Sequence, residues 1–267
     1  MTLQLLVSCV GQDVPALCKK MNIGSDAIIV NQKSEYKTEI FNHNGYLIKA
    51  LSMDEKGVGL SRTTALQRAT ADIVLFADED IVYEDGYEQM VLDEFEKYPD
   101  ADMILFNVNV CEERRTYWNE SAHRVHRWNC GRYPAYSIAA RRKKLHELGI
   151  TYHLWFGGGG IFSNGEDSLF LNESLKKGMK LMAVPTCIGE EKPRENGQLS
   201  TWFNGYDEKY FYDRGVLYHY LYGSLAPIMT FRFLMKNKNT MCKTIPVKRA
   251  KMLMRMGAKM LVPFDEV

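Results

Sequence analysis

The feature of this sequence that most constrains its fold is an alternation of short apolar runs with segments of helical periodicity. Leu3 to Val10 and Ala27 to Val30 are apolar runs, and Val14 to Met21 between them carries apolar residues at helical spacing. The alternation continues with predicted helices over 61–69 and 87–98 and predicted strands over 72–77 and 103–110. Because strands that alternate with helices form largely parallel sheets covered on both faces, the sequence predicts an α/β fold.

Turn and cap signals refine this outline. Asn44 and Gly45, between two apolar positions, are typical of a hairpin or tight turn. A helix is predicted over 168–177, ended by Gly178 and followed by a strand over 179–184. The remaining predictions are an amphipathic helix face at 124–128 (RVHRW) and a polar loop over 190–208.

Length and charge bound the organisation of the chain. Its 267 residues, of which 46% are hydrophobic, suffice for one domain with a sizeable core. We expect a main domain over 1–215 and a basic, Met-rich helical extension over 216–267. The net charge of +1 argues against a nucleic-acid binder, because such proteins need a basic excess to hold phosphates.

The cysteines and the apolar segments bear on location. The six cysteines lie far apart and show neither the spacing of a zinc knuckle nor that of a redox motif. The start, MTLQLLVSCV, lacks the cationic segment of a signal peptide, and no apolar run reaches the roughly 18 to 20 residues that span a bilayer. We therefore expect a cytoplasmic protein with free thiols, working in solution or at the inner face of the plasma membrane.

Three acids, Asp78, Glu79 and Asp80, follow the predicted strand over 72–77. In an open parallel sheet, ligands bind beyond the carboxyl ends of the strands. Residues two apart on a strand face the same way, about 6.5 to 7 Å apart, so Asp78 and Asp80 converge while Glu79 points elsewhere. Such a pair suits Mn²⁺ or Mg²⁺ with substrate phosphates in its shell, and it implies a diphosphate substrate. The alternative is a solvated turn without chemistry.

The segment before the acids favours the functional interpretation. It supplies Gly57 and Gly59, a helix that opens near Ser61, and a cation at Arg62. Backbone amides at a helix N-terminus favour anions, so we expect this segment to hold the far side of the diphosphate.

Two segments in this order, GVGLSRTTALQRATADIVLFADED and FGGGGIFSNGEDSLFL, resemble the central and acceptor-side blocks of the inverting glycosyltransferases of family 2. The resemblance covers about residues 3–185. It implies the GT-A fold, a mostly parallel sheet flanked by helices. It also implies an enzyme that depends on Mn²⁺ or Mg²⁺ and moves one sugar from a nucleotide diphosphate sugar to a hydroxyl group.

The resemblance implies roles for individual residues. Asp80 matches the family's metal-binding acid, and Asp78 matches the acid that reaches the ribose or the donor sugar. Arg62 matches the arginine of the central helix, on the nucleotide side. Asp167 matches the catalytic base of the Glu-Asp pair, and Glu166 is assigned to the acceptor.

The strand ends supply the remaining donor contacts. We assign Ser8, Asn31 and Glu79 to the nucleotide-sugar donor. The family commonly ends its second strand in an Asp pair, whereas this chain has Asn31 and Gln32 there, and uridine is the expected base.

Glu166 and Asp167 also have a structural interpretation, because acids in the first turn of a helix cap its free amides. Trp155, Phe156 and the four glycines that follow favour an acceptor pocket instead. An apolar face can stack on a sugar, and a glycine-rich backbone is flexible. Trp155 is therefore assigned to the acceptor, and both interpretations of the acids remain open.

The basic tail also has two interpretations. Methionines and leucines alternate with cations there, and no Asp or Glu lies between Asp213 and Asp265. Such a helix packs an apolar face on the core, with its cations in solvent. Alternatively, residues 232–259 rest on anionic lipid, where each cation adds about 1 kcal/mol.

Together these patterns predict a transfer of one sugar from a nucleotide diphosphate sugar to a glycan or lipid-linked acceptor, in the assembly of cell-surface polysaccharide or oligosaccharide. Two alternatives remain at this point. A phosphatase of the haloacid dehalogenase type also has an Asp-x-Asp after an apolar strand, but on its first strand. The other alternative is a membrane-associated binding protein of the same fold without turnover.

Overall fold

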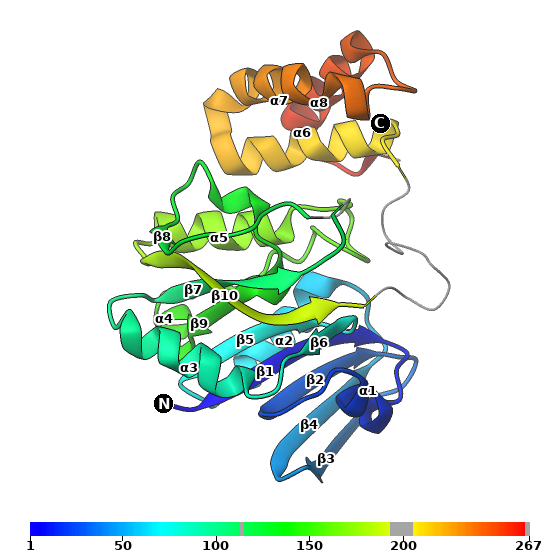
Figure 1. Ribbon diagram of the computed structural model, residues 1–267. Helices are drawn as coiled ribbons and strands as arrows, with labels where there is room; N and C mark the ends of the chain where they lie inside the picture. Colours follow the sequence, from blue (N-terminus) through cyan, green and yellow to red (C-terminus); the bar gives the residue numbers. More distant parts are fainter. Residues whose placement is uncertain (113–114, 193–204, 265–267) are drawn as a thin grey trace.

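The computed structural model describes residues 1–112, 115–192 and 205–264, and Figure 1 shows a twisted sheet between helices with a further group of helices at the C-terminal end. The strands are β1 Leu3–Val10, β2 Asp26–Gln32, β3 Lys37–His43, β4 Tyr46–Met53, β5 Ile73–Asp78, β6 Ile81–Tyr83, β7 Met103–Asn109, β8 His123–Arg124, β9 Ile138–Arg141 and β10 Leu181–Glu191. The α-helices are α1 Val14–Lys20, α2 Val58–Arg68, α3 Tyr87–Lys97, α4 Arg142–Glu147, α5 Glu166–Lys176, α6 Glu208–Tyr222, α7 Ala226–Met241 and α8 Val247–Met260. Short 3₁₀ turns are η1 Cys130–Arg132, η2 Ala135–Ser137 and η3 Gly223–Leu225.

The described strands form one sheet in the order β3-β4-β2-β1-β5-β9-β7-β10-β6, with β8 beside β10. Strands β4, β2, β1 and β5 run parallel, as do β7 and β10, so the predicted α/β arrangement is confirmed. The chain leaves β1 toward β2 on one side and returns to pair β5 on the other. The sheet therefore has a topological switch point between β1 and β5, the place where such folds bind ligands. Ser8 and Asp78 are register partners at these two strand ends.

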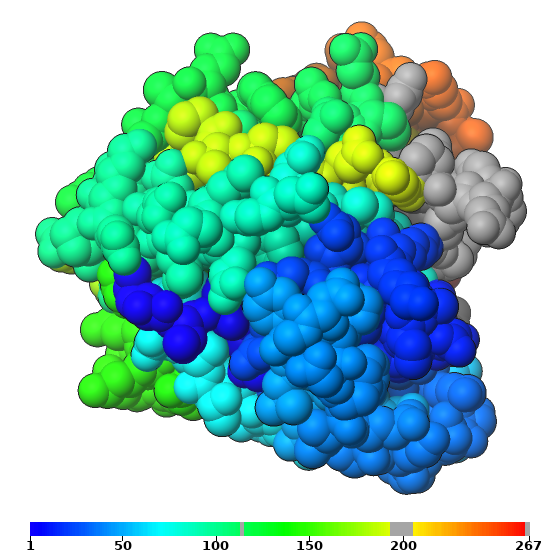
Figure 2. Space-filling model, turned by 60° about the horizontal axis from the view of Figure 1, so that its bottom comes forward, coloured from blue at the N-terminus to red at the C-terminus, as the bar shows by residue number. Residues whose placement is uncertain are grey.

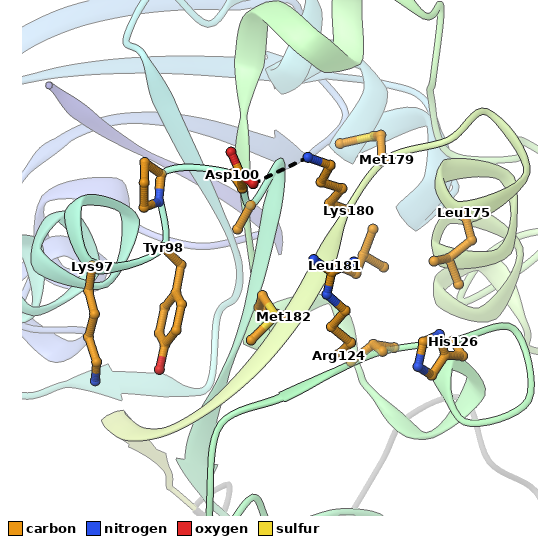
Figure 3. Close-up of a pocket in the computed structure, with 13 residues that line it drawn as sticks. Lys97, Tyr98, Asp100, Arg124, His126, Leu175, Met179, Lys180, Leu181 and Met182 are labelled. Carbon is orange, nitrogen blue, oxygen red and sulfur yellow. Dashed lines mark ion pairs between the residues drawn. The ribbon is translucent and has the colours of Figure 1, made fainter.

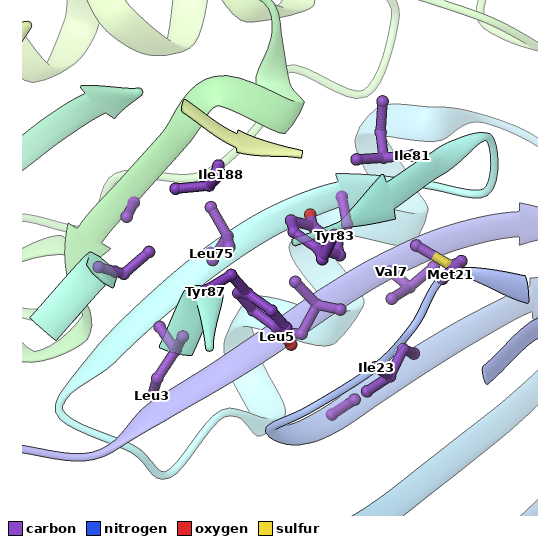
Figure 4. Close-up of a cluster of buried hydrophobic side chains, with 14 of the residues drawn as sticks. Leu3, Leu5, Val7, Met21, Ile23, Leu75, Ile81, Tyr83, Tyr87 and Ile188 are labelled. Atoms are coloured by element: carbon purple, nitrogen blue, oxygen red, sulfur yellow. The ribbon is translucent and has the colours of Figure 1, made fainter. Parts of the chain in front are cut away.

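Side chains of successive residues fill opposite faces of the sheet. On one face Leu5 and Leu75 pack with Tyr83 and Tyr87, as Figure 4 shows. In Figure 2, α3 (teal) and the N-terminal segments in blue form the outer surface of that side. On the other face Phe76 packs edge-on against the rings of residues 152 and 170. Each fully buried side chain of this size stabilises the fold by about 1.5–3 kcal/mol, so the strand ends rest on a firm core.

The C-terminal helices build a third apolar cluster. Gly215 of α6 lies against the carbonyl of Met254 in α8, and Gly257 of α8 lies against the carbonyl of Tyr212, so a Cβ at either glycine would collide. The apolar face of α8, with Leu253 and Met254, is buried, as the packing interpretation of the tail predicted. The boundary expected after residue 215 falls inside α6, and the division into two domains remains a prediction.

Most predicted elements are found with shifted ends. The helix predicted over 61–69 begins at Val58, and the strand predicted over 179–184 runs from Leu181 to Glu191. The turn at Asn44 and Gly45 is confirmed, because it joins the antiparallel strands β3 and β4.

The helix predicted at 124–128 is wrong. Arg124 pairs with Met182 in the β8–β10 ladder, and the side chain of Asn129 accepts the amide of His126. Ladder pairing followed by this side-chain bond holds the segment out of the helical conformation. The loop predicted over 190–208 lies mostly outside the described residues.

Candidate functional site

The candidate site is built around the guanidinium of Arg62. Helix α2 begins after Gly57, whose φ of +125° suits glycine, and places Arg62 in its second turn with 3% of the residue exposed. Nη2 donates to Asp78 Oδ1 at 2.7 Å. Nη1 donates to Asp167 Oδ1 at 2.9 Å and to Glu166 Oε1 at 3.3 Å. One buried cation thus joins the strand-end acid to the two acids of α5.

The strand ends beside Arg62 carry the predicted donor residues. The hydroxyl oxygen of Ser8, opposite Asp78, is buried and makes no hydrogen bond within the described chain. Glu79 Oε2 accepts the amide of Val10 at 2.9 Å. Asp80 follows in the turn to β6, half-buried. The switch point between β1 and β5 is thereby lined by polar groups from both strands.

Glu166 and Asp167 are the first two residues of α5, but they make different contacts. Glu166 Oε2 accepts the amide of Gly165, the residue before the helix, at 3.0 Å, so the capping interpretation fits this side chain. Asp167 does not cap α5: its Oδ2 accepts the amide of Ala135 at 3.1 Å, from a different segment. Arg62 and Ala135 therefore hold the Asp167 carboxylate from two sides.

The electrostatics of the cluster favour a proton-transfer group. Burial raises the pKa of Asp167 to about 8, with Arg62 opposing the rise and Glu166 adding to it. Burial by itself lowers the pKa of Arg62, but Asp78 and Asp167 raise it well above its usual range, so the guanidinium stays charged. A carboxyl that titrates near neutral pH beside a fixed cation has the properties of a general base.

An aromatic wall closes one side of the cluster. The guanidinium of Arg62 lies over the ring of Tyr152, 5.2 Å from its centroid. The Tyr152 ring stacks on Phe170 of α5, with centroids 4.2 Å apart and planes within 3°. This wall keeps water from that side of the ion pairs, which strengthens them.

The glycine-rich loop at 157–160 is compact, not the flexible backbone that the sequence was taken to indicate. Gly157 has a φ of +96°, and a Cβ there would lie 2.6 Å from Glu166 Cδ. A Cβ at Gly159 would lie 3.0 Å from the amide nitrogen of Gly57. These glycines are required because the loop packs directly on the α2 start and on the acids of α5.

Two backbone amides at the start of α2 are bonded within the protein. The amide of Val58 donates to the carbonyl of Gly158 at 2.8 Å. The amide of Gly57 donates to the side chain of Gln32 at 2.9 Å. These two groups do not serve an anion, and the expected contact of the rest of this segment with the diphosphate remains a prediction.

Two other predicted residues lie at the edge of the site. Both polar groups of the Asn31 side chain bond the backbone of Gln12, at 3.1 and 2.8 Å, and this pair shapes the loop after β1. Its direct contact with the donor remains a prediction. Trp155 is 49% exposed and packs edge-on against His153, which leaves much of its ring available to a ligand.

The contacts by which α6 fixes the acceptor-side loop were not predicted from the sequence. Asp213, fully buried, accepts the amide of Ser163 at 2.9 Å and the ammonium of Lys209 at 3.0 Å. Lys209 also donates to the carbonyl of Ile161 at 3.0 Å. The only signals were that Asp213 is the last acid before the basic tail and that Lys209 precedes it by one helical turn. The C-terminal helices therefore hold the loop that leads to Glu166.

The acids at the strand ends fit a divalent cation that shares its shell with a substrate. Among the described residues, no group of three or more His, Cys, Asp or Glu side chains is arranged to hold a metal ion. Mn²⁺ and Mg²⁺ commonly use one or two carboxylates and complete their shell with water and phosphates. Three carboxylates meet one guanidinium here, so a diphosphate would face excess negative charge without a further cation.

A separate hollow of about 440 Å³ lies near the opposite ends of the strands, between the end of α3, β10 and α5. Figure 3 shows its apolar floor at Leu181 and Met182 and the 3.5 Å ion pair between Lys180 and Asp100 at its rim. None of the acids around Arg62 lines this hollow. It is therefore distinct from the candidate site.

Solved structures similar to this one share its fold. The structure of residues 1–349 of S. aureus TarS in complex with UDP-GlcNAc matches with a TM-score of 0.63 and 14% identity, over 91% of this chain and 74% of that one. The same protein in complex with UDP matches with a TM-score of 0.60 and 13% identity, over the same shares. These matches show the GT-A fold. No curated protein matches the sequence.

A sequence model supplies the family. The model described as "Glycosyl transferase family 2" matches residues 24–162, more than half of the chain, including Arg62, Asp78 and Asp80. The matched range ends shortly before Glu166 and Asp167, which the fold brings back to Arg62. The chain belongs to glycosyltransferase family 2 and is a glycosyltransferase with a GT-A fold.

Proposed function

We propose that this enzyme transfers one sugar, with inversion, from a UDP-sugar to a hydroxyl group of a glycan or lipid-linked acceptor. The observation that carries the proposal is the Arg62 bridge, because it holds an acid at the carboxyl end of strand β5 beside a partly buried acid with a raised pKa. Uridine is supported by S. aureus TarS, whose similar structures contain UDP and UDP-GlcNAc.

The donor would lie in the crevice between β1 and β5. Ser8 offers it a buried hydroxyl without a partner in the described chain, and Asp78 offers the carboxylate oxygen that Arg62 leaves open. Glu79 holds the end of β1 through Val10 and so shapes this crevice. Arg62 would act as a positioning residue, since it fixes Asp78 and Asp167 relative to each other.

The metal would be held by Asp80 together with the donor's phosphates. When bound, Mn²⁺ or Mg²⁺ supplies positive charge that stabilises the departing diphosphate as a Lewis acid. The excess of carboxylates over cations at this end of the sheet supports that assignment.

The chemical step is a single displacement. An acceptor hydroxyl gives its proton to Asp167, its oxygen forms a bond to the anomeric carbon, and the bond from that carbon to the diphosphate oxygen breaks on the opposite face. Arg62 and Ala135 keep the Asp167 carboxylate in place, and Tyr152 and Phe170 exclude water behind it. Such a base contributes about 10²–10⁴-fold to the rate.

On the acceptor side, Trp155 offers an exposed ring and Glu166 lines the approach to Asp167. We assign the reaction to the assembly of a cell-surface polysaccharide or oligosaccharide at the cytoplasmic face of the membrane. The six cysteines are free, which fits a reducing compartment.

Contact with the membrane would use α7. None of the helices that the structure describes has the length and apolarity needed to cross a bilayer. Ile228, Phe231 and Met235 are 64, 54 and 41% exposed and lie at helical spacing next to the cations of the tail. Such a face suits the interface of an anionic membrane.

Flotation with anionic vesicles tests this membrane contact. We expect binding that weakens with added salt, and an enzyme that does not bind the vesicles at low salt would contradict the membrane contact.

Donor hydrolysis tests the proposed function. With Mn²⁺ and a panel of UDP-sugars, we expect slow release of UDP without an acceptor and faster release when a glycan hydroxyl is supplied. NMR of the product should show an inverted anomeric centre. A purified enzyme that binds no nucleotide sugar and releases no UDP would overturn the proposal and favour the inactive binding protein. Family membership has already displaced the phosphatase alternative.

A further inference from the structure

A hollow of about 410 Å³ lies between the main body of the fold and the C-terminal helices. Its walls come from the segment around η1, from α5, and from α6 and α7, which Figure 1 shows above α5. Ser168, in the first turn of α5, lines it, whereas the preceding residue, Asp167, does not. This hollow, here named the basic groove, and the proposed base therefore share the first turn of α5.

The lining of the basic groove is strongly cationic. Its charged side chains are Arg127, Arg132, Arg232 and Lys236, and no Asp or Glu lines it. Arg127 donates to the Asn172 amide at 3.4 Å, and Arg132 donates to the Tyr133 hydroxyl at 3.1 Å, both neutral partners. Within the described residues, none of the four cations forms an ion pair. Their charge is therefore left for a ligand.

What sets the groove apart is that its four cations line one hollow. Some exposed lysines elsewhere pair with acids, as Lys37 does with Glu39 at 2.8 Å and Lys177 with Glu173 at 3.4 Å. Others, such as Lys248 on α8, form no ion pair within the described residues but do not line this hollow. Cations of one sign that face one hollow repel each other unless an anion joins them. Two separate parts of the chain supply the four cations, so the acid-poor tail alone does not explain the groove.

We propose that the basic groove binds an acceptor glycan that carries phosphate groups. The inference rests on the proposed function, because the acceptor's hydroxyl has to reach Asp167 from this side. Guanidinium groups bind phosphate oxygens through paired hydrogen bonds, and a phosphate-bearing chain meets several cations at once. Trp128, 73% exposed at the rim, offers an apolar ring face to the sugars between the phosphates.

Binding of labelled dextran phosphate and of unmodified dextran of the same length tests the proposal. We expect the phosphorylated chain to bind at least tenfold more tightly at low salt, and to lose affinity as salt rises. The double variant Arg232→Glu and Lys236→Glu should lower that affinity by at least tenfold. A matched control is Lys248→Glu with Arg255→Glu, which makes the same charge change on α8 outside the groove and should bind like the unaltered enzyme.

Three results would overturn the inference: equal affinity for the two dextrans, equal loss in the two double variants, or a groove variant that keeps its affinity for dextran phosphate but loses binding to anionic lipid vesicles. The last would assign the groove to lipid. Melting temperatures of both double variants confirm that they are folded. UDP release by the unaltered enzyme is measured alongside. If that release is normal and the groove fails its test, only this inference falls; if UDP is never released, the proposed function falls.

Discussion

Two charged regions of this enzyme are built in opposite ways. At the strand ends, one guanidinium with 3% of its side chain exposed meets three carboxylates at 2.7 to 3.3 Å. In the basic groove, four cations on two parts of the chain meet no carboxylate within the described residues. The first region pairs its guanidinium within the protein and is fixed before a substrate arrives. The second leaves its charges for a partner.

The difference indicates that the two regions have different functions. A buried ion-pair network holds its members in one geometry, which the transfer of a proton and a sugar requires. A solvated groove of one sign gains affinity for an oppositely charged ligand and imposes little geometry. The cluster is thus suited to chemistry and the groove to recognition, and equivalent substitutions in the two regions should have different effects.

The largest expected effect is on catalysis in the cluster. Asp167→Asn keeps the shape of the side chain but cannot take the acceptor's proton, so transfer at saturating donor should fall by about 10²–10⁴-fold. Donor affinity, measured by calorimetry, should stay the same because Asp78 and Ser8 are untouched. If donor affinity fell with the rate, Asp167 would belong to the donor site instead.

The same substitution in each region separates paired from unpaired charge. Arg62→Met leaves three carboxylates together without their cation and should destabilise the fold by about 3–5 kcal/mol in urea unfolding. Arg232→Met removes a cation that has no ion pair within the described residues and should change stability by less than about 0.5 kcal/mol. Similar losses in the two variants would contradict the contrast.

A third comparison tests whether the cluster depends on close backbone packing. Gly157→Ala and Gly178→Ala both place alanine at a positive φ, of +96° and +84°. A Cβ added at Gly178 would have open space around it. A Cβ added at Gly157 would lie 2.6 Å from the carboxyl carbon of Glu166 and 2.6 Å from a methyl carbon of Val58. The Gly157 variant should therefore lose about 1–3 kcal/mol more, visible as a lower melting temperature. An equal loss of stability in the two variants would mean that the loop at 157–160 adjusts to the added Cβ without strain.

A further effect concerns pH. Because burial raises the pKa of Asp167 to about 8, the base is mostly protonated below that pH. Transfer should rise about tenfold per pH unit below 8 and level off above it. The folded state holds this proton more tightly than the unfolded state, so stability should fall as pH rises from about 4 to about 8. Asp167→Asn should remove this part of the stability change, and an unchanged profile in that variant would assign it to another group.

The sequence predicted the residues of the cluster but not the contacts between them. The apolar run before Asp78 and the alternation of strands and helices predicted the sheet and its acidic strand end, because both follow from local patterns. The contact of Arg62 with Asp167 spans 105 residues and depends on how α5 docks, which no local pattern encodes. For the same reason the glycine run at 157–160 predicts a flexible backbone, although tertiary packing requires glycine at 157 and 159.

The groove was still harder to foresee. Its cation at 127 lies in the segment 124–128 predicted to be helical, the one at 132 lies beyond that segment, and those at 232 and 236 lie in a tail whose charges had a membrane interpretation. Only the packing of α7 beside η1 brings them to one hollow. The contact of buried Asp213 with the acceptor-side loop could not be predicted either, because its backbone partner, the amide of Ser163, lies fifty residues away.

A crystal structure of the enzyme with UDP-sugar and Mn²⁺ tests the division between the two regions most directly. The account predicts the diphosphate at the ends of β1 and β5 beside Asp78 and Asp80, with the anomeric carbon facing Asp167 and the basic groove without nucleotide. A diphosphate bound instead among Arg127, Arg132, Arg232 and Lys236 would contradict it, since the groove would then be the donor site.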